Sequence, residues 1–358
     1  MAKKGYFILT DISGYTEFLT KSELDHAQAA LQALFDVQLA HIKHPFVISG
    51  FRGDAIFLYL PETNFFAPQT LLESLENLYF VFEDTLRQMV YNTTCPCRAC
   101  RNMSKLDLKM VIHYGEYAVQ ILGDREELVG ADVIVPHRML KNHIIEETGI
   151  ESYAAFSSAA AEALNLSELA WPLVPFVEAY EHIGRIAMQV LDLHKVWERE
   201  QDKQRFVVTP EEAWLAFEWE TPYPPSLVWE YLTNLQIEKR YQGYDLVQRT
   251  DGLGGRMQPE ATYHCAKGEL QFFTWILDWK PFEYVSLRQK VSIGVELTQT
   301  RRTDPMGAGS RLAMYIQQPP ENVSEETKAT IAAIFNDGGQ KLLDLLAADI
   351  ARGTITLA

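Results

Sequence analysis

Residues 6–19 read YFILTDISGYTEFL, and this stretch decides the fold of the first part of the chain. The apolar run at 6–10 predicts a buried strand, which ends at Asp11. Ser13 and Gly14 form the turn after it, and apolar residues at helical spacing from Thr16 to about residue 43 predict a helix. A carboxylate between a buried strand and a helix is a candidate ligand for a divalent cation.

A second candidate carboxylate, Asp54, lies in a tight turn between the predicted strands 46–48 and 55–60. If these strands neighbour the first one, Asp11 and Asp54 meet at one edge of the sheet, and their hard oxygen atoms suit Mg²⁺. The alternative is that Asp11 caps the helix and Asp54 only completes its turn. The turn after Asp11 would also offer backbone N–H groups to a phosphate, from Ser13, Gly14, Tyr15 and Thr16.

The rest of the first half alternates helices and strands. Helical spacing predicts helices at 68–91 and 133–145, and the segments 106–113 and 117–122 are predicted to form a hairpin. The chain therefore runs strand, helix, hairpin, helix, hairpin, helix. That order is typical of an α+β sheet covered by helices.

Composition restricts the class of protein. The 358 residues are 47% hydrophobic, and 32 Lys and Arg stand against 48 Asp and Glu, a formal net charge of −16. A chain this acidic repels phosphate backbones, and we therefore expect no nucleic-acid partner. The sequence has no secretory signal and no run of about 18 apolar residues, and its four cysteines are too few for a disulfide framework. These features predict a cytoplasmic protein with no membrane span.

A charged run at 198–204 and a change of pattern after it predict two domains. We expect a first domain at 1–200, a linker at 201–212 and a second domain at 213–358. The second domain begins with a strand, continues through several antiparallel strands, and closes with one long amphipathic helix at 324–351.

Residues 7–19 and the triplet Gly53-Asp54-Ala55 are similar to the two metal motifs of class III adenylate and guanylate cyclases, and residues 108–116 and 129–140 resemble later segments of that domain. The resemblance covers roughly residues 5–195. It implies a ferredoxin-like nucleotide cyclase fold that binds a nucleoside triphosphate with Mg²⁺ or Mn²⁺ at Asp11 and Asp54, with the carbonyl of Ile12 as a further ligand. It also implies a homodimer, because each site takes half of its residues from a partner chain.

Four positions bear on activity within that resemblance. Arg138 falls on the family's catalytic arginine, and Glu127 on a position that reads the base. Gly50 stands in place of the lysine that selects the base, and Ile134 in place of the asparagine that orients the ribose. Loss of one charge-stabilising donor typically lowers a rate by about 10²–10³-fold. Three functions stay open: a divergent cyclase in signalling, a nucleotide sensor without turnover, or a ligand carrier whose first domain only dimerises.

The sequence Cys95-Pro96-Cys97-Arg98-Ala99-Cys100 places three thiols within six residues. Thiolates at this spacing converge readily on Zn²⁺, which takes four ligands, and His113 and His137 are candidates for the fourth. The alternatives are a redox pair of Cys97 with Cys100, or a loop with no special role. The cluster and the strand after it also resemble a cyclase-like bacterial family of unknown function (DUF2652).

In the second domain, residues 224–233 and 276–282 are similar to the first helix and a middle strand of the helix-grip fold, the START/Bet v 1-like superfamily (SRPBCC, polyketide-cyclase-like). This resemblance implies an apolar cavity between a curved sheet and the last helix, which binds a small lipophilic ligand. Aromatic residues on strands also serve ordinary core packing, which is the alternative. The predicted lining residues are Phe272, Phe273, Trp275, Trp279, Tyr284 and Tyr315.

Overall fold

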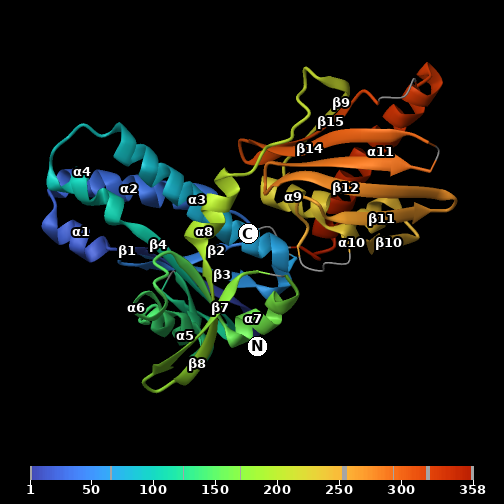
Figure 1. The fold of residues 1–358 in the computed structure, drawn as a ribbon. Coiled ribbons are helices and arrows are strands. Elements are labelled where there is room, and N and C mark those ends of the chain that lie inside the picture. The colour runs from blue at the N-terminus through green and yellow to red at the C-terminus, as the bar shows by residue number, and fades with distance from the viewer. Residues whose placement is uncertain are drawn as a thin grey trace. The chain divides into compact units, whose positions relative to one another are not determined.

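The computed structural model describes residues 2–64, 67–123, 125–169, 171–251, 256–292, 294–319 and 323–355, except for the side chains of Asn64 and Arg125. The chain forms two compact units, the first ending at Lys203 and the second beginning at Gln204 (Figure 1). Among the helices that the structure describes, none is long and apolar enough to cross a membrane.

The first unit is built on a mixed β-sheet. Its strands are β1 (Lys3–Ser13), β2 (Val47–Arg52), β3 (Ala55–Pro61), β4 (Asp107–Leu122), β5 (Arg125–Val129), β6 (Tyr153–Ser157), β7 (Leu173–Tyr180) and β8 (Gly184–Asp192). They lie in the order β2-β3-β1-β4-β6-β8-β7, and β5 pairs with the outer part of β4. Within the described residues, β4 and β6 are parallel and the other pairs are antiparallel. Strand β1 is therefore central, between β3 and β4.

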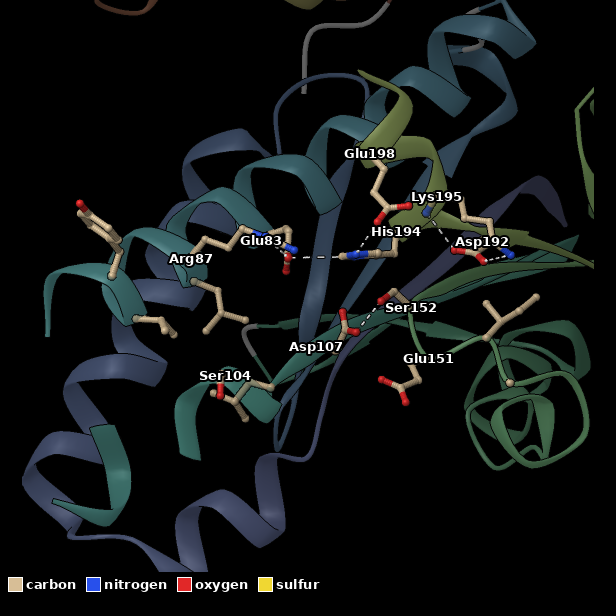
Figure 2. A pocket seen from close by; sticks show the side chains of 16 residues that line it. Glu83, Arg87, Ser104, Asp107, Glu151, Ser152, Asp192, His194, Lys195 and Glu198 are labelled. Carbon is tan, nitrogen blue, oxygen red and sulfur yellow. Dashed lines mark hydrogen bonds and ion pairs between the residues drawn. The ribbon is translucent and has the colours of Figure 1, made fainter. Parts of the chain in front are cut away.

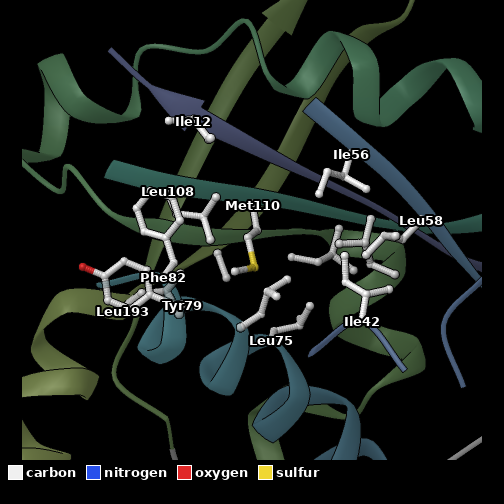
Figure 3. Packing of buried hydrophobic residues seen from close by; sticks show 14 of the residues in the cluster. Ile12, Ile42, Ile56, Leu58, Leu75, Tyr79, Phe82, Leu108, Met110 and Leu193 are labelled. Carbon is white, nitrogen blue, oxygen red and sulfur yellow. The ribbon is translucent and has the colours of Figure 1, made fainter. Parts of the chain in front are cut away.

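Helices cover both faces of this sheet, which explains why the apolar run in β1 does not alternate with polar residues. Ile8 and Ile12 pack against α2 and α3 in one core, part of which Figure 3 shows, and Phe7 and Leu9 pack against α5 and α6 in the other. The helices of the unit are α1 (Tyr15–Lys21), α2 (Leu24–His41), α3 (Pro68–Asn92), α4 (Arg98–Asn102), α5 (Ala131–Met139), α6 (Ile144–Thr148), α7 (Ser158–Ala163) and α8 (Leu193–Gln201).

The predicted α+β class is confirmed, but two helices are shorter than predicted. The helix expected from Thr16 onward is broken at Ser22, whose backbone is extended, and the carboxylate of Glu23 accepts a hydrogen bond from the N–H of Ala99 (3.0 Å). The helix expected at 133–145 ends at Met139, because the side-chain amide of Asn142 donates to the Met139 carbonyl (2.6 Å).

The hairpin predicted at 106–122 is wrong, since β4 is one continuous strand. Gly115, which suggested a turn, lies opposite Gly5 and continues the pairing with β1. A Cβ atom at Gly115 would collide with the side chain of Asp132 on α5. This glycine therefore permits the close approach of a helix and does not mark a turn.

The second unit is an antiparallel sheet with a long helix at its C-terminal end. The strands lie in the order β10-β11-β12-β13-β14-β15-β9, where β9 is Ala213–Thr221, β10 Leu246–Arg249, β11 Thr262–Lys267, β12 Leu270–Lys280, β13 Tyr284–Val291, β14 Glu296–Met306 and β15 Gly309–Gln317. The helices are α9 (Pro225–Thr233), α10 (Leu235–Gln242) and α11 (Glu325–Ala351). The predicted order of elements is confirmed, and the assignment to the helix-grip fold stays a prediction.

Candidate functional site

Asp11 lies near the end of β1, and Asp54 lies in the turn that leads into the neighbouring strand β3, so the two candidate carboxylates are at the same end of the sheet. Asp11 pairs directly with Ala55, the residue that follows Asp54 in the β2–β3 hairpin. On its other side Asp11 lies opposite Lys109 of β4, and Lys109 Nζ is 3.0 Å from Asp11 Oδ2. The site is thus formed by two acidic side chains and one lysine, supplied by three adjacent strands.

The pKa of Asp54 is affected by its acidic neighbour Asp11. Burial, and then the negative charge of Asp11, raises the pKa of the Asp54 carboxyl above its usual range. A cation placed between the two carboxylates would relieve that repulsion. The donor set, one carboxylate on β1 and one in the β2–β3 turn, fits Mg²⁺ or Mn²⁺, which prefer oxygen ligands.

The segment predicted to bind phosphate contains less turn than predicted: β1 continues to Ser13, Gly14 alone separates it from α1, and Tyr15 and Thr16 begin that helix. Gly14 has φ +80°, and a Cβ atom there would come within 3.0 Å of the Lys105 carbonyl oxygen, so glycine is required. Ser13 Oγ is buried and has no hydrogen-bond partner among the described residues. Tyr15 packs against the core under α3, and the Thr16 carbonyl accepts the Thr20 hydroxyl (2.8 Å). Phosphate binding at 13–16 stays a prediction.

The other predicted site residues make no such contact with Asp11 or Asp54 within the described part of the chain. Arg138 is exposed at the end of α5, and its side chain makes no hydrogen bond or ion pair within the described residues. Glu127 on β5 faces the Asp54 hairpin, with Oε2 3.7 Å from Arg52 Nη2. The side chain of Ile12 is buried in the core that α2 and α3 cover. That its carbonyl is a metal ligand stays a prediction.

Sequence reasoning missed Lys109. A lysine on a strand is an ordinary surface residue until the register of the sheet is known, and only the pairing of β1 with β4 sets it against Asp11. Gly50 and Ile134, the positions that depart from the cyclase pattern, lie on β2 and α5, and 53% of the Ile134 side chain is exposed.

A cavity of about 800 Å³ lies near the start of β4 and β6 (Figure 2). Asp107 accepts a hydrogen bond from Ser152, and the Ser152 Oγ atom accepts one from the Tyr79 hydroxyl (3.1 Å). Beside them Glu83 accepts a short hydrogen bond from Arg87 (2.6 Å). Burial raises the pKa of Asp107 to about 6. These residues come from segments far apart in the sequence, so no local motif marked them.

The charge of this cavity makes it a poor site for phosphate. Arg87 and Lys195 are its fixed cations, whereas five carboxylates line it: Glu83, Asp107, Glu151, Asp192 and Glu198. A nucleoside triphosphate would be repelled there. The pair Asp11 and Asp54 is therefore the better candidate for a nucleotide with its cation.

The three predicted cysteines converge, and a histidine from another helix joins them. His26 of α2 lies with Cys95, Cys97 and Cys100, and the four ligand atoms are all within 4.8 Å of one another. The predicted fourth ligands are wrong. His113 contacts Ser157, with Nδ1 2.8 Å from Oγ, and the ring of His137 packs edge-on against Phe57. His113 lies on β4 and His137 on α5, and neither belongs to the group of side chains that lie together with the thiols.

The second unit encloses a cavity of about 250 Å³ between its sheet, α10 and α11. Of the six aromatic residues predicted to line it, Phe272 does so and the other five are not among its described lining residues. Phe272 faces the cavity, and because side chains alternate along a strand, Phe273 and Trp275 lie on the opposite face of β12 and are exposed. Tyr284 donates to Asp278 (2.8 Å) and Tyr315 to Glu218 (2.7 Å).

The lining of that cavity is mainly apolar, and its charged residues are Lys267, Arg301, Asp337 and Lys341. Arg301 lines it and lies 3.3 Å from Glu238, and both side chains are almost fully buried. The apolar lining includes Leu270, Phe272, Val291, Leu297, Ile331 and Phe335.

Comparisons with known proteins bear on the first unit. The profile of a family described as a protein of unknown function (DUF2652) matches residues 31–148, so the predicted likeness to it is confirmed. An uncharacterized protein of Mycobacterium tuberculosis (Rv2561/Rv2562) is 31% identical over 144 residues, which span 40% of this chain and 64% of that protein.

Solved structures similar to the chain include two nucleotide cyclases. The guanylyl cyclase Cya2 is 16% identical with a TM-score of 0.43, and the match covers 53% of this chain and 92% of that one. The adenylyl cyclase CyaB from P. aeruginosa is 16% identical with a TM-score of 0.40, over 54% of this chain and 95% of that one. The activity in each name belongs to the protein named.

Proposed function

We propose that the first unit is a divergent, class III nucleotide cyclase-like domain that binds a nucleoside triphosphate with Mg²⁺ or Mn²⁺ at Asp11 and Asp54. One observation carries the proposal: Asp11 pairs with Ala55, the residue after Asp54, so both residues are at the same end of the neighbouring strands β1 and β3. Both residues also lie in the two short motifs that resemble those of the cyclases.

The chain's own groups divide the work as follows. Asp11 and Asp54 hold the cation, and Lys109 balances the charge of Asp11 while the site is empty of nucleotide. Lewis-acid chemistry on the phosphates and on the ribose hydroxyl is what a divalent cation supplies in such a site. Arg138, exposed on α5, is free to reach phosphate in a partner chain across a two-fold axis.

Turnover is expected to be slow. Ile134 offers no hydrogen bond to a ribose, and Gly50 offers no side chain to select a base. One missing charge-stabilising donor costs about 10²–10³-fold in rate, and two such losses favour a second candidate function, a nucleotide sensor without turnover.

For the second unit we propose binding of a small lipophilic ligand, which would couple to the nucleotide site in signalling. The enclosed, mainly apolar cavity of about 250 Å³ supports this. A chain that binds such a ligand but no nucleotide would be a carrier with a first unit that only dimerises.

The first experiment measures binding. Asp54→Asn should lower the affinity for a non-hydrolysable nucleotide in Mn²⁺ by at least about tenfold, because it removes an anionic oxygen ligand. Glu181→Gln, an exposed acidic residue at the tip of the β7–β8 hairpin, is the matched control and should bind like the unaltered protein. Unchanged affinity in Asp54→Asn, with its fold intact by circular dichroism, would mean that the site is elsewhere.

The second experiment measures turnover. The full chain is incubated separately with ATP, GTP, CTP and UTP in Mg²⁺ or Mn²⁺, and products are read by mass spectrometry. A cyclic nucleotide supports the enzyme, and binding without product supports the sensor. If the chain neither binds a nucleotide nor forms a product, the enzyme and the sensor are both ruled out, and the carrier remains.

A further inference from the structure

We propose that His26, Cys95, Cys97 and Cys100 bind one structural Zn²⁺ ion. His26 comes from the first turn of α2, Cys95 and Cys97 from the segment that joins α3 to α4, and Cys100 from α4 itself. The site lies apart from Asp11 and Asp54, and it is independent of the nucleotide proposal.

The distances are those of a tetrahedral zinc site. His26 Nδ1 is 3.3 Å from Cys97 Sγ and 3.6 Å from both Cys95 Sγ and Cys100 Sγ. Zinc bonds of about 2.1 Å to nitrogen and 2.3 Å to sulfur, at the tetrahedral angle, put these atoms about 3.6 Å apart. All three separations lie close to that value.

Hydrogen bonding alone does not explain this arrangement. The Nδ1 atom of an imidazole has either one proton or one lone pair, so it makes one directed hydrogen bond and not three. Three sulfur atoms and one nitrogen this close together can all bind one ion placed between them. The four side chains supply a Cys₃His set, which structural zinc sites use.

The surrounding backbone supports ligand thiolates. The N–H of Cys100 donates to Cys97 Sγ (3.3 Å), a bond that stabilises a thiolate at the start of α4. The nearest carboxylate, Glu23, is already engaged, since Oε2 accepts the Ala99 N–H.

The centre would brace one side of the unit. It would tie α4 to α2, and the next segment carries Lys105, whose carbonyl lies against Gly14 at the start of α1. Zinc would thus fix the segment that packs against Gly14, just after Asp11 in the chain. Removal of zinc should raise amide hydrogen exchange in α4 and α1 and leave β13 and β14 of the second unit unchanged.

The test begins with the full chain, purified under reducing conditions with zinc supplied. We expect about one zinc per chain by elemental analysis, and Co²⁺ in its place should give the thiolate charge-transfer and visible bands of a tetrahedral site. Alkylation with peptide mapping should leave Cys95, Cys97 and Cys100 unmodified until a chelator is added. Protein without zinc, thiols that react at the same rate with and without chelator, or a Cys97–Cys100 disulfide would each overturn the proposal.

Variants identify the fourth ligand. His26→Ala should lower the affinity for zinc, measured against a chromophoric chelator, by at least about tenfold, since three thiolates remain. His41→Ala is the matched control, because His41 lies on the same helix and its ring is 2.8 Å from the Val37 carbonyl of that helix, away from the thiols. Equal affinities in the two variants would remove His26 from the site. If His26→Ala does not fold, the cobalt spectrum of the unaltered chain still reports whether nitrogen completes the set.

Discussion

At the scale of single residues, Asp107 shows how burial sets the chemistry of a side chain. Its carboxyl is removed from water beside the cavity of the first unit, and that raises its pKa to about 6, although hydrogen bonds from Ser152 and the Leu108 N–H oppose the shift. The negative charge of Glu83 adds to the rise. The folded state therefore holds a proton at Asp107 more tightly than the unfolded chain does.

The stability of the first unit should consequently fall as the pH rises. A carboxyl whose pKa is raised on folding stabilises the fold below about pH 4, and that contribution is lost as the pH passes about 6. Between pH 4 and pH 8 the unaltered protein should lose up to about 3 kcal/mol relative to Asp107→Asn. Hydrogen exchange of the β1 and β4 amides at each pH measures this difference.

Asp36→Asn is the control for this prediction, because Asp36 is an exposed acidic residue on α2. Its free energy of unfolding should follow the unaltered protein at every pH. If Asp107→Asn also follows it, the carboxyl is already ionised at low pH and its burial has no effect on stability.

At the scale of elements, helix α11 contains two adjacent glycines with different surroundings. A Cβ atom at Gly339 would collide with the ring of Trp219, which belongs to β9. A Cβ atom at Gly338 would meet only the end of the Gln242 side chain, 2.8 Å away, which has room to rotate. Substituting each glycine in turn therefore distinguishes the effect of close packing against Trp219 from the general cost of glycine in a helix.

Gly338→Ala should leave the second unit as stable or more stable by up to about 1 kcal/mol, the usual gain of alanine over glycine in a helix. Gly339→Ala should instead destabilise it by about 1–3 kcal/mol, because the Trp219 ring must move. Urea unfolding followed by tryptophan fluorescence compares the two variants. Equal stabilities would show that the contact between α11 and β9 adapts at no cost.

Elements also show where sequence reasoning succeeds and where it stops. The strand at 6–10 and the acidic turns were predictable because each depends on a short run of residues. Lys109 and His26 were not, since their roles arise from pairing with distant segments. In the second unit the predicted lining named Phe272 and Phe273 together, but neighbouring side chains on a strand lie on opposite faces, and of these two Phe272 faces the cavity.

At the scale of the whole molecule, the first unit exposes apolar side chains on adjacent elements, the outer part of β4, β5 and α5. They are Ile121, Leu122, Val129 and Ile134. An apolar surface of this kind is typical of a protein interface. We expect it to form the two-fold dimer that the cyclase resemblance implies.

Ile134→Asn tests that expectation. Ile134 is largely exposed in the single chain, so the change should affect the fold by no more than about 0.5 kcal/mol. Within a dry dimer contact the amide should weaken association by about 1–3 kcal/mol, without a gain in turnover. Sedimentation equilibrium and cyclic-nucleotide yield are measured on the same preparation.

Tyr91→Asn is the control, since Tyr91 is exposed on α3, which packs against the opposite face of the sheet from α5. It should dimerise like the unaltered chain. An Ile134→Asn protein that dimerises fully and cyclises a nucleotide faster would mean that the amide restores a ribose contact.

The central place of β1 in its sheet has a consequence during synthesis. Lys3 lies opposite Tyr117, so the ribosome finishes β1 long before it makes the strand that covers its second edge. At ordinary rates of elongation, that wait is on the order of ten seconds. Throughout it the nascent chain presents an apolar strand with an open edge, which invites pairing with other chains. The yield of folded protein in a cell should therefore depend on what shields β1 during that interval.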